Sequence, residues 1–286
     1  MGQSNGVHAL TDRLSRIQAL GLARSLLFLP ASNARAVEKA RSLPCDMVIL
    51  DLEDAVVAAD KAAARDAAVA AITQGFGDRL TGIRINAQGT ADWHGLDMLA
   101  MVKAKPDFVV LPKVSSVKQI YDVAAIVGRQ VIAMIEDGAG LLAAPAIAAE
   151  HHTAALFVGV NDLRHSLDIP AGGAREGLMT ALQSVLIAAR AFGKPAFDGV
   201  YNKLDDPEGF AAECAQGRAW GFAGKTLIHP GQIDSANRLF GPDAESVARA
   251  RRLVDAATGG AERFEGEMVE AMHVAQARAV IAAAER

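Results

Sequence analysis

The sequence has little of what marks several large classes of protein. Its 286 residues include two cysteines, Cys45 and Cys214, too few for a disulfide framework or a cysteine metal site. Aromatic residues make up 5%, and Asp plus Glu (33) outnumber Lys plus Arg (29), a balance that does not suit nucleic-acid binding. No apolar run reaches the roughly 18 residues of a membrane span, and the first residues lack a signal-peptide core. We therefore expect a cytoplasmic protein without nucleic-acid or membrane partners.

What the chain does contain is a regular alternation of apolar runs and alanine-rich segments. Hydrophobic residues make up 51%, enough for a large core. The β-rich runs are SLLFLP (25–30), DMVILDLED (46–54), TGIRIN (81–86), DFVVLPK (107–113), QVIAMIED (130–137), AALFVGVND (154–162), PAFDGV (195–200) and GKTLIHP (224–230). Continuous apolar runs are typical of parallel strands covered on both faces. Eight strand and helix pairs predict an α/β fold, the (β/α)8 TIM barrel.

The alternative α/β architecture is an open doubly wound sheet, which normally has a glycine-rich phosphate turn after its first strand. Here the first strand is followed by ASNAR, without glycine, and this favours the barrel. Beyond the eighth strand we expect helices near 231–240, over 243–257 and over 265–286, with a hinge at 258–266. The predicted organisation is a barrel domain over 1–240, with an extension at 1–23, and a C-terminal helical lid over 241–286.

Polar residues interrupt the predicted strands at their carboxyl ends, where such barrels place their chemistry. They are Asp51, Glu53, Asp54, Arg84, Asn86, Lys113, Glu136, Asp137, Asn161, Asp162, Asp198, Asn202, Lys225 and His229. Carboxylates predominate, and they repel one another unless a cation lies among them. Oxygen donors without cysteine or paired histidine favour Mg²⁺ or Mn²⁺. Glu136 and Asp162, which end adjacent predicted strands, are the predicted ligands. The competing interpretation is that strand-end carboxylates cap the helices that follow.

Arg84 ends the third predicted strand, where a buried guanidinium requires an anionic partner. One interpretation is structural, and pairs Arg84 with Asp51 or Glu53 in a buried salt bridge. The other is functional, and directs its fork of N–H groups at a developing oxyanion. Both can hold at once.

The motifs RSLLFLPASNARAVEKA, VILDLEDAV, RIN, LPKV, AMIEDGAG, GVNDL, DGVYNKLDDPEGF and GKTLIHPGQI follow one another from Arg24 onward. Together they resemble the HpcH/HpaI aldolase/citrate lyase family, specifically its citrate lyase β-subunit-like CoA ester lyases, which include malyl-CoA and citramalyl-CoA lyases. The resemblance implies a Mg²⁺-dependent barrel that reversibly cleaves a short 3-hydroxyacyl-CoA into acetyl-CoA and a 2-oxo acid. It also implies a homotrimer or homohexamer, because the lid of these enzymes acts across subunits.

The resemblance also assigns roles to individual residues. The metal carboxylates correspond to Glu136 in MIED and Asp162 in GVNDL, and the arginine that contacts substrate corresponds to Arg84 in RIN. The contacts to the CoA-bearing substrate correspond to Phe28, Lys39, Asn161, Ile228 and His229. The acidic cluster that supports the metal and the arginine corresponds to Asp51, Glu53 and Asp54.

The lid is a departure from the family pattern. Related malyl-CoA lyases carry an acid/base aspartate there, and this chain has Glu270 in the run GEMVE. The extra methylene changes the reach of the carboxylate. Glu270 is therefore either a catalytic acid/base or a solvated glutamate on a terminal helix. As an acid/base it would complete a catalytic set with Arg84, Glu53 and Asp51.

Three other functions stay open at this level. The chain could be the β-subunit of a citrate lyase complex, whose acyl group sits on a carrier protein, or a thioesterase for the same CoA ester. It could also be a non-catalytic acyl-CoA-binding protein that lost turnover through the change at Glu270. The lid favours a stand-alone enzyme, and the retained Glu136, Asp162 and Arg84 argue against lost turnover.

Overall fold

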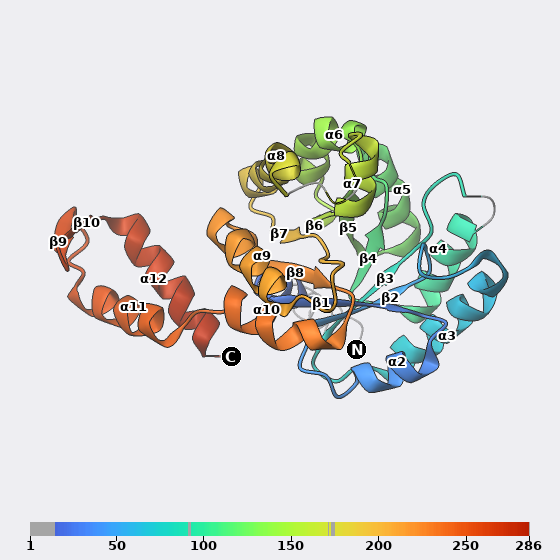
Figure 1. Ribbon diagram of the computed structural model, residues 1–286, viewed down its shortest axis with the longest axis horizontal. Coiled ribbons are helices and arrows are strands. Elements are labelled where there is room, and N and C mark those ends of the chain that lie inside the picture. The colour runs from blue at the N-terminus through green and yellow to red at the C-terminus, as the bar shows by residue number, and fades with distance from the viewer. Residues whose placement is uncertain (1–14, 91–92, 171, 173–174, 286) are drawn as a thin grey trace, which may run out of the picture.

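The computed structural model describes residues 15–90, 93–170, 172 and 175–285. Eight parallel strands close into a barrel in chain order, which confirms the predicted (β/α)8 fold (Figure 1). They are β1 (Ser25–Pro30), β2 (Met47–Asp51), β3 (Leu80–Arg84), β4 (Phe108–Leu111), β5 (Gln130–Ile135), β6 (Thr153–Val158), β7 (Ala196–Asp198) and β8 (Gly224–Leu227). Several predicted runs extend past the observed strand ends, so that Glu53 and Asp162 lie in the segments that follow β2 and β6.

Helices surround the barrel (Figure 1). They are α2 (Ala34–Ala40), α3 (Lys61–Gln74), α4 (Trp93–Ala104), α5 (Val117–Val127), α6 (Gly138–Ala149), α7 (Val160–Ser166), α8 (Met179–Ala191), α9 (Pro207–Trp220) and α10 (Ile233–Phe240). Their ends follow from local chemistry, as α9 shows. Asp206 caps its start by accepting from the Gly209 N–H at 2.8 Å, Pro207 takes the first helical position, and Gly221 ends it with a left-handed φ of 107°.

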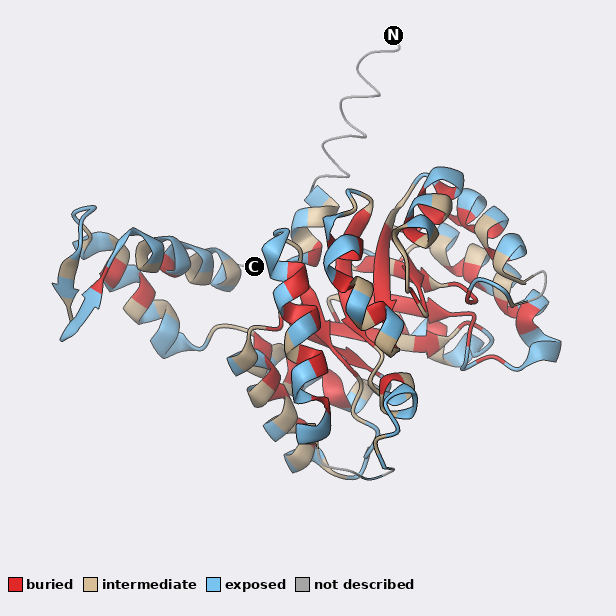
Figure 2. Cartoon of the chain, turned by 90° about the horizontal axis from the view of Figure 1, so that it is seen from above, coloured by how far each residue is buried: buried red, intermediate tan, exposed pale blue. Residues whose placement is uncertain are grey.

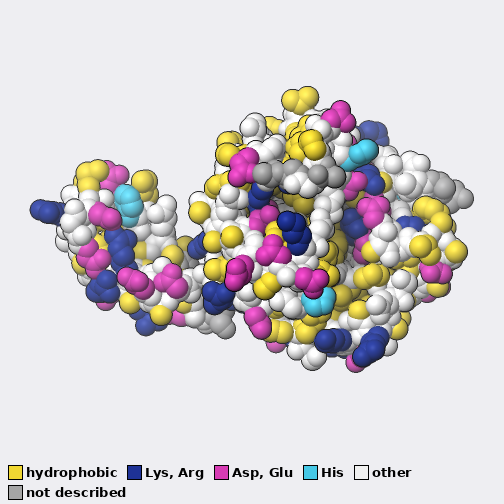
Figure 3. Space-filling model, viewed as in Figure 1, with side chains coloured by type: hydrophobic (Ala, Val, Ile, Leu, Met, Phe, Trp, Pro, Cys, Tyr) yellow, Lys and Arg dark blue, Asp and Glu magenta, His cyan; other side chains and the backbone are white. Residues whose placement is uncertain are grey.

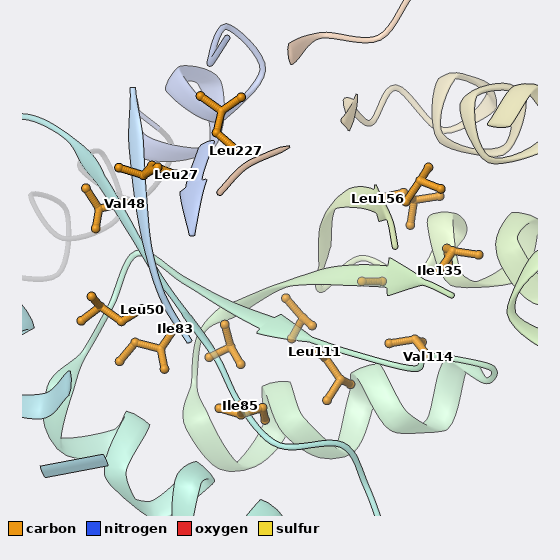
Figure 4. Close-up of a cluster of buried hydrophobic side chains, with 14 of the residues drawn as sticks. Leu27, Val48, Leu50, Ile83, Ile85, Leu111, Val114, Ile135, Leu156 and Leu227 are labelled. Carbon is orange, nitrogen blue, oxygen red and sulfur yellow. The ribbon is translucent and has the colours of Figure 1, made fainter. Parts of the chain in front are cut away.

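Alternation along the strands divides the apolar side chains into two sets. The inward set fills the barrel and includes Leu26, Met47, Ile49, Phe108, Val110, Ile132, Met134, Phe157 and Phe197. The outward set, which lies beneath the helices, includes Leu27, Val48, Leu50, Ile83, Leu111, Ile135 and Leu156 (Figure 4). Leu20 and Ala23, just before β1, belong to the inward set and close the amino-terminal end of the barrel. This packing leaves the opposite end for chemistry.

After α10 the chain forms an appendage beside the barrel (Figures 1 and 2). It consists of α11 (Ala244–Ala256), an antiparallel hairpin of β9 (Glu262–Phe264) and β10 (Glu267–Val269), and α12 (Ala271–Ala284). The prediction of a helix from residue 265 was wrong, because Glu265 and Gly266 have left-handed φ angles of 49° and 92° and form the hairpin turn. The appendage has a small core of its own, and most of its surface is exposed (Figure 2). Over the described residues, none of the helices has the length and apolar character needed to cross a membrane.

Candidate active site

A cavity of about 410 Å³ lies at the carboxyl ends of the barrel strands. Eight predicted site residues line it: Phe28, Asp51, Asp54, Arg84, Glu136, Asn161, Asp162 and Ile228. Met134 and Thr226 also line it and were missed. They stand two positions before Glu136 and Ile228, so the two-residue period of a strand could have found them. On the face shown in Figure 3, acidic and basic side chains of the described residues are interspersed over the barrel, without a broad patch of either sign.

Arg84 is held at the mouth of the barrel by two carboxylates. Its Nε and Nη2 donate to Asp51 Oδ1 and Oδ2 at 2.7 and 2.5 Å, and its Nη1 lies 3.1 Å from Glu53 Oε2. Burial acts to lower the pKa of Arg84, but hydrogen bonding and attraction to Asp51 outweigh it and raise that pKa. The structure thus contains the buried salt bridge that the sequence suggested. A guanidinium has five N–H groups, and the two hydrogen bonds to Asp51 use two of them. Arg84 therefore keeps N–H groups that can bind an anionic ligand in the cavity it lines.

Asp51 also shapes the loop that follows β2. Its Oδ1 accepts from the Glu53 N–H at 2.9 Å and its Oδ2 from the Ala55 N–H at 3.2 Å. Lys61, buried at the start of α3, donates its Nζ to the carbonyls of Leu52 and Glu53 at 2.7 and 2.6 Å. These bonds fix the loop so that the Glu53 carboxylate faces Arg84. Sequence reasoning gave Lys61 no role, although it lies in the DKAAAR segment just after the acidic cluster.

Glu136 follows β5 and is 2% exposed. Its Oε2 accepts from the backbone N–H of Lys113 at 2.6 Å. Burial, and then the neighbouring charge of Glu53, raise the pKa of Glu136 to about 8. The residue next to it has to be small, because a Cβ added to Gly159 would lie 2.4 Å from Glu136 Cγ. The ionised Glu136 carboxylate therefore needs a cation beside it.

Asp162 lies in the first turn of α7, one element later than the strand end that was predicted. It lines the same cavity as Glu136, and its charge adds to those that raise the pKa of Glu136. A divalent cation relieves the repulsion that neighbouring carboxylates exert on Glu136, and oxygen donors suit Mg²⁺. The donor set of the cavity thus fits the predicted metal.

Besides Glu53, which pairs with Arg84, three of the residues given a functional role lie outside the cavity lining. Lys39 is exposed on α2, which follows β1. His229 caps the short helix η3 (Pro230–Gln232) by accepting from the Gly231 N–H at 3.0 Å. Glu270 caps α12, whose start lies at the outer part of the appendage (Figure 1). The roles given to these three residues stay predictions.

Asp198 and Lys225 were expected at the mouth, and this prediction was wrong. The Nζ of Lys225 donates to Asp198 Oδ2 at 2.8 Å and to Glu213 Oε1 at 2.7 Å, and Arg175 Nη2 lies 2.7 Å from Asp198 Oδ1. Glu213 belongs to α9, so the two strand residues face outward, toward the helices. They form a buried ion network between strands and helices.

Glu150, His151 and His152 form a second group that could hold a metal, with ligand atoms within 4.8 Å of one another. This group lies between α6 and β6, at the amino-terminal end of the barrel and away from the cavity. It has no part in the site described above.

At the carboxyl ends of the barrel strands, an arginine held by two carboxylates lies beside further carboxylates that could bind a metal. Sites of this kind stabilise oxyanions with the help of a divalent cation. This defines a class of barrel enzyme. The HpcH/HpaI aldolase/citrate lyase family matches residues 24–230, and the chain belongs to this family. The predicted family is thereby confirmed, and with it the prediction of an enzyme of the lyase type.

Two relatives and one solved structure show how far the similarity extends. The (3S)-malyl-CoA thioesterase of Cereibacter sphaeroides (strain KD131) is 40% identical over 271 residues, covering 92% of this chain and 94% of that protein. Citrate lyase subunit beta of Escherichia coli (strain K12) is 33% identical over 282 residues, covering 92% and 93%. The structure of CitE from Mycobacterium tuberculosis in complex with magnesium, acetoacetate and coenzyme A aligns with a TM-score of 0.80 at 34% identity, covering 93% and 99%.

Proposed function

We propose that the protein is a Mg²⁺-dependent carbon–carbon lyase. Its substrate would be a short 3-hydroxyacyl-CoA such as malyl-CoA or citramalyl-CoA, which it cleaves to, or forms from, acetyl-CoA and a 2-oxo acid. The observation that carries the proposal is the convergence of Glu136, Asp162 and Arg84 on one cavity. The structure of CitE, which aligns with this chain at a TM-score of 0.80 and contains magnesium, acetoacetate and coenzyme A, supports the proposal.

Glu136 and Asp162 would hold the metal ion. When bound, Mg²⁺ orients the 2-oxo acid and polarises its carbonyl as a Lewis acid, and Mn²⁺ could replace it on the same oxygen donors. The Lys113 N–H, at 2.6 Å from Glu136 Oε2, leaves the other carboxylate oxygen of Glu136 for the ion. Gly159 keeps the space beside that carboxylate open.

Arg84 would stabilise the negative oxygen that develops during the reaction. In the cleavage direction a base takes the proton of the substrate hydroxyl, the carbon–carbon bond breaks, and its electron pair passes to the thioester as an enolate. The N–H groups of Arg84 that are not bonded to Asp51 suit the enolate oxygen, and an acid then protonates the enolate carbon to give acetyl-CoA. Asp51 and Glu53 hold the guanidinium in place beforehand, so it does not need to reorganise as charge develops.

Glu270 is the proposed acid/base. It precedes α12 at the outer part of the appendage, away from the cavity of its own barrel, so it would act at the cavity of a second copy (Figure 1). Met268 and Met272 flank it with exposed fractions of 70% and 59%, an apolar surface suited to docking. We therefore propose a homotrimer or homohexamer in which each appendage closes a neighbouring mouth. Residues 241–286 would form this lid, and residues 1–240 the barrel domain.

Binding of the CoA-bearing substrate would involve side chains from several elements. Phe28, Asn161 and Ile228 line the cavity, His229 follows β8 at the same end of the barrel, and Lys39 lies in the last turn of α2. A cytoplasmic location is part of the proposal, since Cys45 and Cys214 are both free and buried, as reduced thiols are.

Thioester hydrolysis is the second candidate, and the 40% identity to a (3S)-malyl-CoA thioesterase favours it. A third is a citrate lyase subunit that acts on a carrier-bound acyl group, as the relative from Escherichia coli suggests. Hydrolysis passes through no enolate of acetyl-CoA, whereas the reversible lyase reaction does. The two reactions therefore differ in whether the acetyl methyl group exchanges hydrogen with solvent.

This difference provides the test. Acetyl-CoA is incubated in D₂O with the protein, Mg²⁺ and a 2-oxo acid, glyoxylate or pyruvate, and deuterium in its methyl group is followed by mass spectrometry. The lyase should exchange, and the Arg84→Met variant should not. Release of free CoA from malyl-CoA without any methyl exchange would instead establish the thioesterase. Exchange in the variant at the wild-type rate would remove Arg84 from the enolate role.

A further inference from the structure

Lys113, two residues after the end of β4, has a backbone conformation that is unusual for a lysine. Its φ is 53°, in the left-handed region, where any Cβ is crowded and glycine is the default residue. Four described non-glycine residues have such angles: Lys105, Lys113, Asp168 and Glu265. Of these, Lys113 is the one that is bonded to a cavity carboxylate. A glycine would relieve the strain, so the presence of a side chain here requires an explanation.

The left-handed turn takes the backbone N–H of Lys113 out of the sheet. This N–H donates to Glu136 Oε2 at 2.6 Å, whereas the next residue, Val114, returns to the sheet and donates to the Met134 carbonyl at 3.2 Å. Pro112, just before it, has no N–H to contribute. The N–H of Lys113 therefore makes no hydrogen bond between strands and instead donates to Glu136, the carboxylate proposed to bind the metal.

The side chain of Lys113 contacts Glu53, the carboxylate that pairs with Arg84. Its Nζ lies 3.1 Å from Glu53 Oε1, while Arg84 Nη1 lies 3.1 Å from Glu53 Oε2. Glu53 is 4% exposed, and the Lys113 side chain is 42% exposed, so the ammonium reaches the buried carboxylate from the solvent side. Two cations therefore hold the Glu53 carboxylate between them.

We propose that Lys113 is a positioning residue that sets both halves of the site. Its backbone N–H holds Glu136 in the orientation that binds Mg²⁺, and its ammonium holds Glu53 against Arg84. The inference rests on the proposed function, because it treats Glu136 as a metal ligand. The two contributions act in opposite directions on the Mg²⁺ affinity, since the N–H orients a ligand while a nearby ammonium repels the cation.

Substitutions at this position separate the two contributions. Lys113→Gly removes the ammonium and keeps the left-handed backbone, whereas Lys113→Val removes the ammonium and strongly disfavours that backbone. In calorimetric titrations with Mg²⁺ alone, we expect Lys113→Gly to bind at least as tightly as wild type. Lys113→Val should bind roughly tenfold more weakly than Lys113→Gly.

Lys105, at the end of α4, is the matched control because its φ is 56° and its N–H bonds within the helix, to the Met101 carbonyl. Lys105→Gly and Lys105→Val should differ in Tm and bind Mg²⁺ with the same Kd. A merely structural role for Lys113 would likewise change Tm without separating the two Kd values. If Lys113→Val does not fold, Lys113→Ala takes its place, because a Cβ alone disfavours the left-handed region.

If the wild type binds Mg²⁺ and Lys113→Gly and Lys113→Val have equal Mg²⁺ Kd values, the role of the Lys113 backbone in orienting Glu136 is overturned. The role of the ammonium is not affected by that result. Absence of Mg²⁺ binding by the wild type would overturn the proposed function itself. If the ammonium holds Glu53 against Arg84, Lys113→Gly should lower kcat severalfold, and Lys113→Arg, which keeps a positive charge there, should retain most of the wild-type kcat. Turnover of Lys113→Gly at the wild-type level would contradict that role.

Discussion

Replacement of Arg84 by lysine is the perturbation whose effect the structure defines best. The guanidinium reaches three carboxylate oxygens, at 2.7 and 2.5 Å on Asp51 and 3.1 Å on Glu53, and it retains N–H groups for the cavity. A single ammonium cannot span these oxygens and also face a substrate. Loss of one oxyanion donor typically lowers kcat by about 10² to 10³. We therefore expect Arg84→Lys to lower kcat by roughly a hundredfold or more, and to leave Mg²⁺ binding at Glu136 and Asp162 intact.

Arg65 provides the matched control for this substitution. Its Nε lies 2.7 Å from Asp97 Oδ1, and its side chain is 11% exposed, against 12% for Arg84. Both replacements weaken hydrogen bonds between charged groups, worth about 1.5–3 kcal/mol each, so both should lower Tm. Turnover of malyl-CoA and thermal unfolding are measured for the two variants. The reasoning is refuted if Arg84→Lys keeps near wild-type kcat, or if Arg65→Lys loses as much kcat as Arg84→Lys.

Three further predictions concern the metal ligands and the lid. Since the pKa of Glu136 is about 8 without metal, a proton competes with Mg²⁺ at lower pH. Mg²⁺ affinity in calorimetry should rise about tenfold per pH unit up to roughly pH 8 and then level off, and a flat profile from pH 6 to 8 would contradict this. Gly159→Ala would bring a Cβ to 2.4 Å from Glu136 Cγ and should weaken Mg²⁺ binding, whereas Gly95→Ala, with nothing within 4 Å of the new Cβ, should leave it unchanged. Equal Mg²⁺ Kd values for the two alanine variants would count against the account. Glu270→Gln should lower kcat at unchanged Mg²⁺ Kd, and unaltered kcat would remove Glu270 from the mechanism.

The barrel was predictable because strands covered on both faces leave long apolar runs in the sequence. The same property hides which way each side chain points. Asp198 follows Phe197, and Lys225 lies between Gly224 and Thr226, so no regular alternation of polar and apolar residues showed that the two side chains face α9. The role of Glu136 was easier to predict, because this carboxylate interrupts the apolar run of β5 at its carboxyl end, where the site lies.

Backbone geometry was the part of the site that the sequence concealed. A lysine gives no signal for a left-handed φ, so the bond from the Lys113 N–H to Glu136 could be found only in the structure. The same holds for Glu265, whose left-handed φ begins the hairpin turn where a continuous helix was expected. Residue types therefore predicted which groups meet at the mouth of the barrel, and backbone conformation determined how they are held there.

The most direct test of the central claim is the product ratio from malyl-CoA and from both citramalyl-CoA enantiomers, measured with Mg²⁺ and with EDTA. Carbon–carbon cleavage at the Glu136, Asp162 and Arg84 site predicts acetyl-CoA and 2-oxo acid in equal amounts, formed with Mg²⁺ and abolished by EDTA. Release of free CoA without any 2-oxo acid would contradict the lyase and identify the protein as a thioesterase.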